Sequence, residues 1–130
     1  MGASFTKKSF GRPARWEVAG ISWLSEQVAH GGAAVVEVIS VGAHGLTETR
    51  VPSAPPTPSA AAEFGRRLAV THHLDGARWG EGPRGWAGPG YQGPNDHLLE
   101  LPLAPHALWG AMYADERVAP LVRQADLPET

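Results

Sequence analysis

The spacing of apolar residues predicts an amphipathic helix over residues 15–27. Large or apolar side chains recur there every three or four positions, at Trp16, Ala19, Trp23 and Leu24. An α-helix makes one turn every 3.6 residues, so this spacing places them on one face. Pro13 suits a first helical turn, and Gly31-Gly32 ends the pattern.

A change to β-branched residues predicts two strands after this helix. Residues 34–41 are rich in valine and isoleucine, and a second short run covers residues 46–51. Gly42-Ala43-His44-Gly45 separates the two runs. Because β-branched side chains fit a pleated surface and glycines suit tight turns, we expect an antiparallel hairpin.

A proline-punctuated linker over residues 52–56 leads to a second predicted helix. Thr57 offers a hydroxyl for the N-cap, and Pro58 suits the first helical position. The helix is expected to bury one stripe of side chains, formed by Ala61, Phe64, Leu68 and either Thr71 or His72.

The second half of the chain predicts loops followed by one more helix. Residues 76–105 contain too many glycines and prolines for long regular elements. Residues 107–125 again have apolar side chains at helical spacing, at Leu108, Trp109, Met112, Tyr113 and Val118. Pro120 is expected to kink or divide this helix, because proline lacks the N–H that the helix interior needs.

Composition limits the classes of function. The 130 residues, 42% of them hydrophobic, suit one modest domain or part of a larger one. A net charge of -2, from 11 Lys+Arg and 13 Asp+Glu, gives no electrostatic reason to expect binding to nucleic acid or an anionic membrane. Without cysteine, a signal sequence or a long apolar run, we expect a soluble protein of the cytoplasm.

The candidate chemistry starts from Lys7, in the segment Phe5-Thr6-Lys7, and Glu17, expected in the first turn of the first helix. In protein kinases a strand lysine holds the nucleotide phosphates and a helix glutamate positions it. The predicted order of strand, helix, hairpin, linker and helix is that of a kinase-like small lobe from its lysine strand onward. From spacing alone, such a pair is more often solvated surface, and Lys8 is a rival lysine.

Several segments share residue types and spacing with one known family. They are Phe5-Thr6-Lys7, Glu17–Leu24, Pro56-Thr57, Phe64–His72, Gly76–Gly80, Gly85–Tyr91, Trp109–Tyr113 and Arg117–Pro120. In this order they resemble motifs of the fructosamine (ketosamine) kinase family, and the match spans roughly residues 5 to 125.

The resemblance implies an α+β fold class with a partial protein-kinase-like fold. Residues 1–51 would form part of the small lobe, with antiparallel strands and one packed helix between the lysine strand and the hinge. Residues 52–130 would form the linker and the helical start of the large lobe. Lys7 and Glu17 would serve the nucleotide phosphates, while backbone groups near Glu48 and Thr49 would meet the adenine.

The resemblance also implies ATP and Mg²⁺ as cofactors and a sugar-derived amine as substrate, phosphorylated on a ketoamine sugar hydroxyl in protein or metabolite deglycation. The catalytic-loop and metal-binding residues are expected beyond residue 130, and the phosphate-covering glycine-rich hairpin before Lys7. His73-Leu74-Asp75 imitates a catalytic loop, but Gly80 stands where that loop needs asparagine. No catalytic or metal-binding residue is therefore assigned, and the chain alone is expected to transfer phosphate poorly.

A non-catalytic binding or regulatory module is the alternative. Such a module would keep the small-lobe scaffold and pair with another chain, or associate with itself. Exposed apolar surface on the last helix would favour this alternative, because a soluble protein rarely leaves a large apolar patch uncovered.

The remaining features have structural interpretations. His72 is expected to pack against the core or to bond a neighbouring loop, while His97 and His106 stand alone, so the histidines predict no metal site. The polar segment Asn95-Asp96-His97 is explained by the residue preferences of a turn, and no catalytic role is assigned to it. The tryptophans are expected mainly to fill the core.

Overall fold

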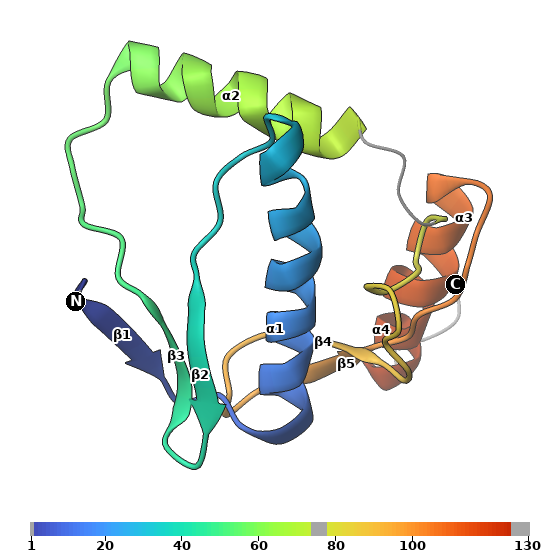
Figure 1. The fold of residues 1–130 in the computed structure, drawn as a ribbon. Coiled ribbons are helices and arrows are strands. Elements are labelled where there is room, and N and C mark those ends of the chain that lie inside the picture. Colours follow the sequence, from blue (N-terminus) through green and yellow to red (C-terminus); the bar gives the residue numbers. More distant parts are fainter. Residues whose placement is uncertain (1, 74–77, 126–130) are drawn as a thin grey trace. The chain divides into compact units, whose positions relative to one another are not determined.

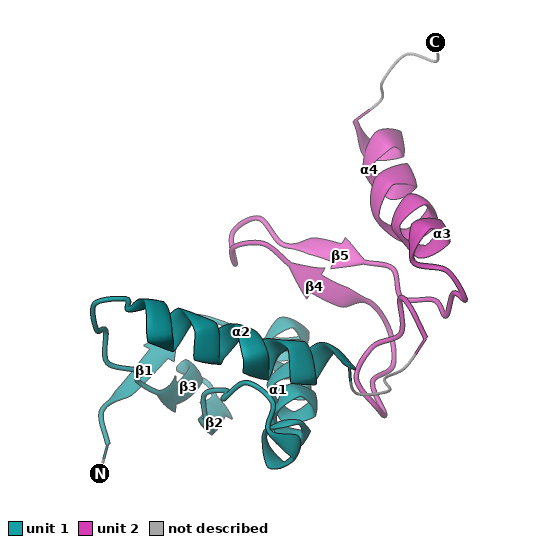
Figure 2. Ribbon diagram, turned by 90° about the horizontal axis from the view of Figure 1, so that it is seen from above, with its two compact units in different colours: residues 1–75 teal, residues 76–130 magenta. Residues whose placement is uncertain are grey.

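The structure, a computed structural model, describes residues 2–73 and 78–125. It divides into two compact units, residues 1–75 and residues 76–130, which Figure 2 colours separately. Each unit combines helices with a small antiparallel sheet, so the expected α+β class holds at this coarse level. The units divide later in the chain than the boundary at residues 51 and 52 that the family resemblance implies.

The first unit contains a three-stranded antiparallel sheet of β1 (Ser4–Lys7), β2 (Val38–Gly42) and β3 (Gly45–Thr49), with β3 in the centre. The predicted hairpin between β2 and β3 is confirmed, with a shorter first strand than expected. A register shift between Val38 and Ser40 interrupts the pairing at the beginning of β2.

The strand register decides which side chains share a face of the sheet. Lys7 lies opposite Leu46, and Phe5 lies opposite Glu48. Because side chains alternate along a strand, these four point to the same face. Thr6 points to the other face, where its hydroxyl lies 2.9 Å from the hydroxyl of Thr47.

Gly45 begins the central strand at a place where only glycine fits. Its φ of 120° is in a region that other residues rarely adopt, and a Cβ there would lie 2.2 Å from the carbonyl oxygen of Lys7. The close approach of these two backbones therefore depends on the missing side chain. Leu46, the next residue, is completely buried.

The first helix, α1, covers Gly11–Glu26 and confirms the predicted amphipathic segment. It begins earlier than expected, because Pro13 and the residues before it already form the first turn. Glu17 consequently lies in the second turn, not the first. A short 3₁₀ turn, Val28–His30, follows, and Gly31 ends it with a left-handed φ of 88°.

The second helix, α2, covers Pro58–His73 and begins as predicted. The backbone N–H of Ala60 donates to the Thr57 hydroxyl at 3.1 Å, which caps the helix start.

The expected burial of an apolar stripe on α2 is wrong. No residue of this helix is buried, and Phe64 is 58% exposed. A hydrogen bond joins α2 to the segment after α1 near the helix end, where the N–H of Ala33 donates to the Thr71 hydroxyl at 3.0 Å. In Figure 1 the last turns of α2 pass beside the end of α1.

The second unit consists mostly of irregular backbone, as predicted for the described part of residues 76–105. Its regular elements are β4 (Gly90–Gln92), β5 (Leu99–Leu101), α3 (Trp109–Tyr113), a π-helical segment (Ala114–Val118) and α4 (Ala119–Gln124). The predicted last helix is divided by the π-helical segment, which ends just before Pro120. A proline ring clashes with the carbonyl four residues earlier, which favours a wider turn there.

Among the residues described, no helix is long and apolar enough to cross a membrane.

Candidate functional site

The structure brings three of the four predicted site residues together on one face of the first sheet. The Lys7 ammonium forms an ion pair with Oε1 of Glu17, on α1, and lies 3.3 Å from Oε2 of Glu48, on β3. The strand register places Glu48 on the same face as Lys7, and α1 packs over that face with Glu17 turned inward. One cation therefore contacts two carboxylates.

The two carboxylates change the acid-base behaviour of Lys7. Burial by itself would lower the pKa of the Lys7 ammonium, but the hydrogen bond and charge of Glu17, with those of Glu48, raise it above its ordinary value of 10.5. The Lys7 side chain is 32% exposed, so part of it remains open to solvent. Lys7 is therefore charged at physiological pH and accessible.

Glu48 is the unusual member of the cluster. Its side chain is only 9% exposed, and its Oε1 oxygen has no hydrogen-bond partner among the residues described. A buried carboxylate oxygen without a donor is costly, because it has lost water and gained nothing in return. The family resemblance implies a backbone role for this residue at a hinge, while in the structure its side chain reaches the lysine.

Thr49 lies apart from this cluster. Its backbone N–H donates to the carbonyl of Glu37 at 2.9 Å, and its hydroxyl lies 3.4 Å from a Glu37 carboxylate oxygen. The Thr49 backbone N–H is therefore used within the first unit. Lys8, the rival lysine, is exposed just beyond β1.

The cluster fits a nucleotide phosphate in one respect and opposes it in another. Lys7 has three N–H donors, and with Glu17 and Glu48 as acceptors one of them remains for a phosphate oxygen. Glu48 adds a second negative charge, which repels an unneutralised phosphate. For Mg²⁺, the described chain contains no group of three or more histidine, aspartate or glutamate side chains. The residues thus fit ATP phosphates at Lys7 but show no magnesium site of their own.

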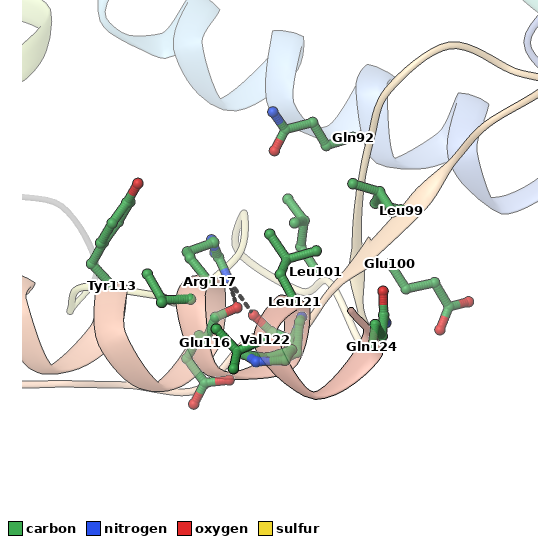
Figure 3. Close-up of a pocket in the computed structure, with 13 residues that line it drawn as sticks. Gln92, Leu99, Glu100, Leu101, Tyr113, Glu116, Arg117, Leu121, Val122 and Gln124 are labelled. Atoms are coloured by element: carbon green, nitrogen blue, oxygen red, sulfur yellow. Dashed lines mark hydrogen bonds between the residues drawn. The ribbon is translucent and has the colours of Figure 1, made fainter. Parts of the chain in front are cut away.

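A second candidate site is a pocket of about 450 Å³ in the second unit, which the sequence did not indicate. β5 and the helical segments form its walls, and Arg117 stands in it, as Figure 3 shows. Nη1 of Arg117 donates to the carbonyl oxygens of Pro102, at 2.8 Å, and Glu116, at 3.0 Å. The apolar lining residues include Leu99, Leu101, Tyr113, Val118, Leu121 and Val122.

The histidine predictions have mixed outcomes. His106 does not stand alone, because its Nε2 lies 3.1 Å from Oε1 of Glu116 and both side chains are mostly buried. His72 is exposed, and its neighbour Thr71 makes the bond to a neighbouring loop. Nothing in the local sequence indicates the His106–Glu116 pair. Of the candidate loop His73-Leu74-Asp75, the last two residues lie outside the described part of the chain.

The tryptophans fill the core less than expected. Trp79 and Trp109 are 54% and 53% exposed, and the other three are partly exposed. Trp109 stacks on Tyr113 with ring centroids 5.0 Å apart, an i,i+4 pair that helical spacing could have predicted.

Searches against protein-family models, curated proteins and solved structures found no match for this chain.

Proposed function

We propose that the first unit is a nucleotide-binding small lobe of the kinase type, from a protein of the fructosamine kinase kind that phosphorylates a sugar-derived amine. The single observation that carries this proposal is the ion pair between Lys7, on a strand, and Glu17, on the following helix. Kinases use a strand lysine and a helix glutamate in the same relation.

In this proposal Lys7 neutralises phosphate oxygens of the nucleotide, and Glu17 keeps the ammonium aimed at them. The raised pKa keeps Lys7 charged at physiological pH, as this role requires. ATP, when bound, would supply the phosphoryl group. No residue of the chain is proposed as the catalytic base.

Titration calorimetry with ATP and MgCl₂ tests the binding role. The wild-type protein is expected to bind, and Lys7→Ala is expected to weaken binding by about tenfold or more, equivalent to about 1.4 kcal/mol. Glu17→Gln should weaken it less, because the lysine remains but is no longer held by a charge. Lys8→Ala is the matched control and should bind like the wild type.

The proposal fails if the wild type does not bind ATP, or if Lys7→Ala and Lys8→Ala bind it equally well. Assaying the same samples for phosphorylation of a ketoamine tests the second half of the proposal. Little or no transfer is expected, because no catalytic base is assigned.

A second candidate function, a module that pairs with another chain, is favoured by the apolar surface of the last helical segments. Leu108 is 70% exposed, Trp109 53%, and Leu121 49%. Among residues 78–125, Met112 and Pro83 are the only buried residues with an apolar side chain. A surface of this kind is typical of a protein contact.

A further inference from the structure

The pocket around Arg117 contains a cation that has no charged partner among the described residues. Within the described residues Arg117 forms no ion pair, and its Nη1 is bound only by backbone carbonyls. The neighbouring carboxylate, Glu116, is already bonded to His106. A partly buried guanidinium keeps three further N–H donors on Nε and Nη2, and these suit a carboxylate from outside.

The same pocket contains an anion that also lacks a charged partner. Glu100, on β5, lines the pocket, and its carboxylate is exposed and makes no ion pair within the described residues. One pocket thus presents one unmatched cation and one unmatched anion. Figure 3 shows Arg117 and Glu100 on different sides of the leucines between them.

The apolar surface continues beyond the pocket. Tyr113 lines the pocket and is 48% exposed, and the ring of Trp109 stacks on it from outside. A small molecule in the pocket would leave Trp109 uncovered, whereas a protein surface could cover both rings. Exposed tryptophan, tyrosine and arginine side chains are also the types enriched where proteins bind each other.

We propose that the pocket residues, together with Trp109, form a surface through which two copies of this chain associate. In a two-fold arrangement each contact occurs twice, so Arg117 of each copy can meet Glu100 of the other. Both unmatched charges are then neutralised at once, and the leucines and aromatic rings between them are covered. This inference rests on the second candidate function and is independent of Lys7, which belongs to the first unit.

A charge exchange tests the arrangement, with molar mass measured by light scattering or sedimentation. The wild type is expected to have the mass of a dimer. Glu100→Arg and Arg117→Glu should each shift the mass to that of a monomer, because like charges then face each other across the two-fold axis. The double variant, Glu100→Arg with Arg117→Glu, should restore the dimer, because both opposite-charge contacts are rebuilt.

Arg84→Glu is the matched control, since Arg84 is exposed in the same unit and does not line the pocket. It should remain a dimer. Glu100→Arg separates loss of association from loss of folding. Arg117 donates a hydrogen bond within the unit, whereas the exposed Glu100 side chain makes no such bond, so its substitution should leave the fold intact.

A dimer that survives both single substitutions would overturn the inference but leave pairing as a function. A monomeric wild type would overturn the inference and the self-pairing form of the second function together. Neither result bears on nucleotide binding at Lys7.

Discussion

Lys7 in the first unit and Arg117 in the second are both partly buried cations, and the protein compensates them differently. Two carboxylates from two different elements contact Lys7. Arg117 donates to two backbone carbonyls, and no carboxylate of the described residues pairs with it. Carbonyl dipoles hold a guanidinium in place but do not neutralise it. The first cation is therefore compensated within its unit, while no carboxylate of the described residues compensates the second.

The side chains around the two cations also differ in how deeply they are buried. Around Lys7 the sheet buries Leu46 completely and Glu48 almost completely. Around Arg117 several apolar side chains are more exposed, from 37% for Leu99 to 49% for Leu121. Burial strengthens each polar contact, because water no longer competes for the same groups. The comparison predicts that packing within the first unit stabilises the Lys7 site. The Arg117 pocket, by contrast, is predicted to be stabilised by association with a second copy of the chain.

Met112 is the position in the second unit where internal fit should matter most. Met112→Ala is expected to destabilise the unit by about 2–3 kcal/mol, because it removes the buried side chain that Gly80 closely approaches. Urea unfolding followed by tryptophan fluorescence measures the loss, in a Glu100→Arg background that removes self-association. Leu108→Ala is the control, since Leu108 is 70% exposed. Equal losses for both would mean that this unit has no core.

Gly45 supports the Lys7 site from the backbone. Gly45→Ala is expected to cost about 1–3 kcal/mol, because it strains a φ of 120° and drives a methyl group into the Lys7 carbonyl. Gly42→Ala is the matched control, because a Cβ there meets nothing within 4 Å. Urea unfolding compares the two variants, and ATP titration should show weaker binding only for Gly45→Ala. A larger loss for Gly42→Ala would refute this account of the turn.

Lys7 should contribute to stability as well as to binding. Lys7→Met is expected to cost about 1–3 kcal/mol, because it leaves the buried Glu48 carboxylate without its cation. Adding Glu48→Gln should recover much of the loss, since both charges are then gone. Lys8→Met, by contrast, should leave the free energy of unfolding within about 0.5 kcal/mol of the wild type.

The pH dependence of that contribution follows from the raised pKa of Lys7. The folded protein binds this proton more tightly than the unfolded chain, so the contribution is complete below the ordinary value of 10.5. It is lost as pH rises through the higher folded value. The stability difference between wild type and Lys7→Met should therefore hold from neutral pH to about 10 and shrink at more alkaline pH. A difference that disappears below pH 9 would contradict the ion pair.

Local sequence signals predicted most of the regular elements. The apolar spacing that includes Trp16 and Trp23 correctly predicted α1, and the Thr57 hydroxyl correctly predicted the start of α2. These signals succeed because helical spacing, caps and turns depend on residues only a few positions apart. The burial predicted for Phe64 is wrong, because burial depends on another element covering the helix, and no residue of α2 is buried.

By itself, the sequence indicated α1, α2 and the β2–β3 hairpin. A family pattern paired Lys7 with Glu17 as candidates. Only the tertiary structure decided the partners that come from distant segments. The strand register brought Glu48 to Lys7, and the fold of the second unit brought Glu116 to His106. It also left Arg117 beside apolar side chains without a carboxylate among the described residues. Electrostatic contacts act through space, so local composition cannot reveal them until the backbone has placed the charges side by side.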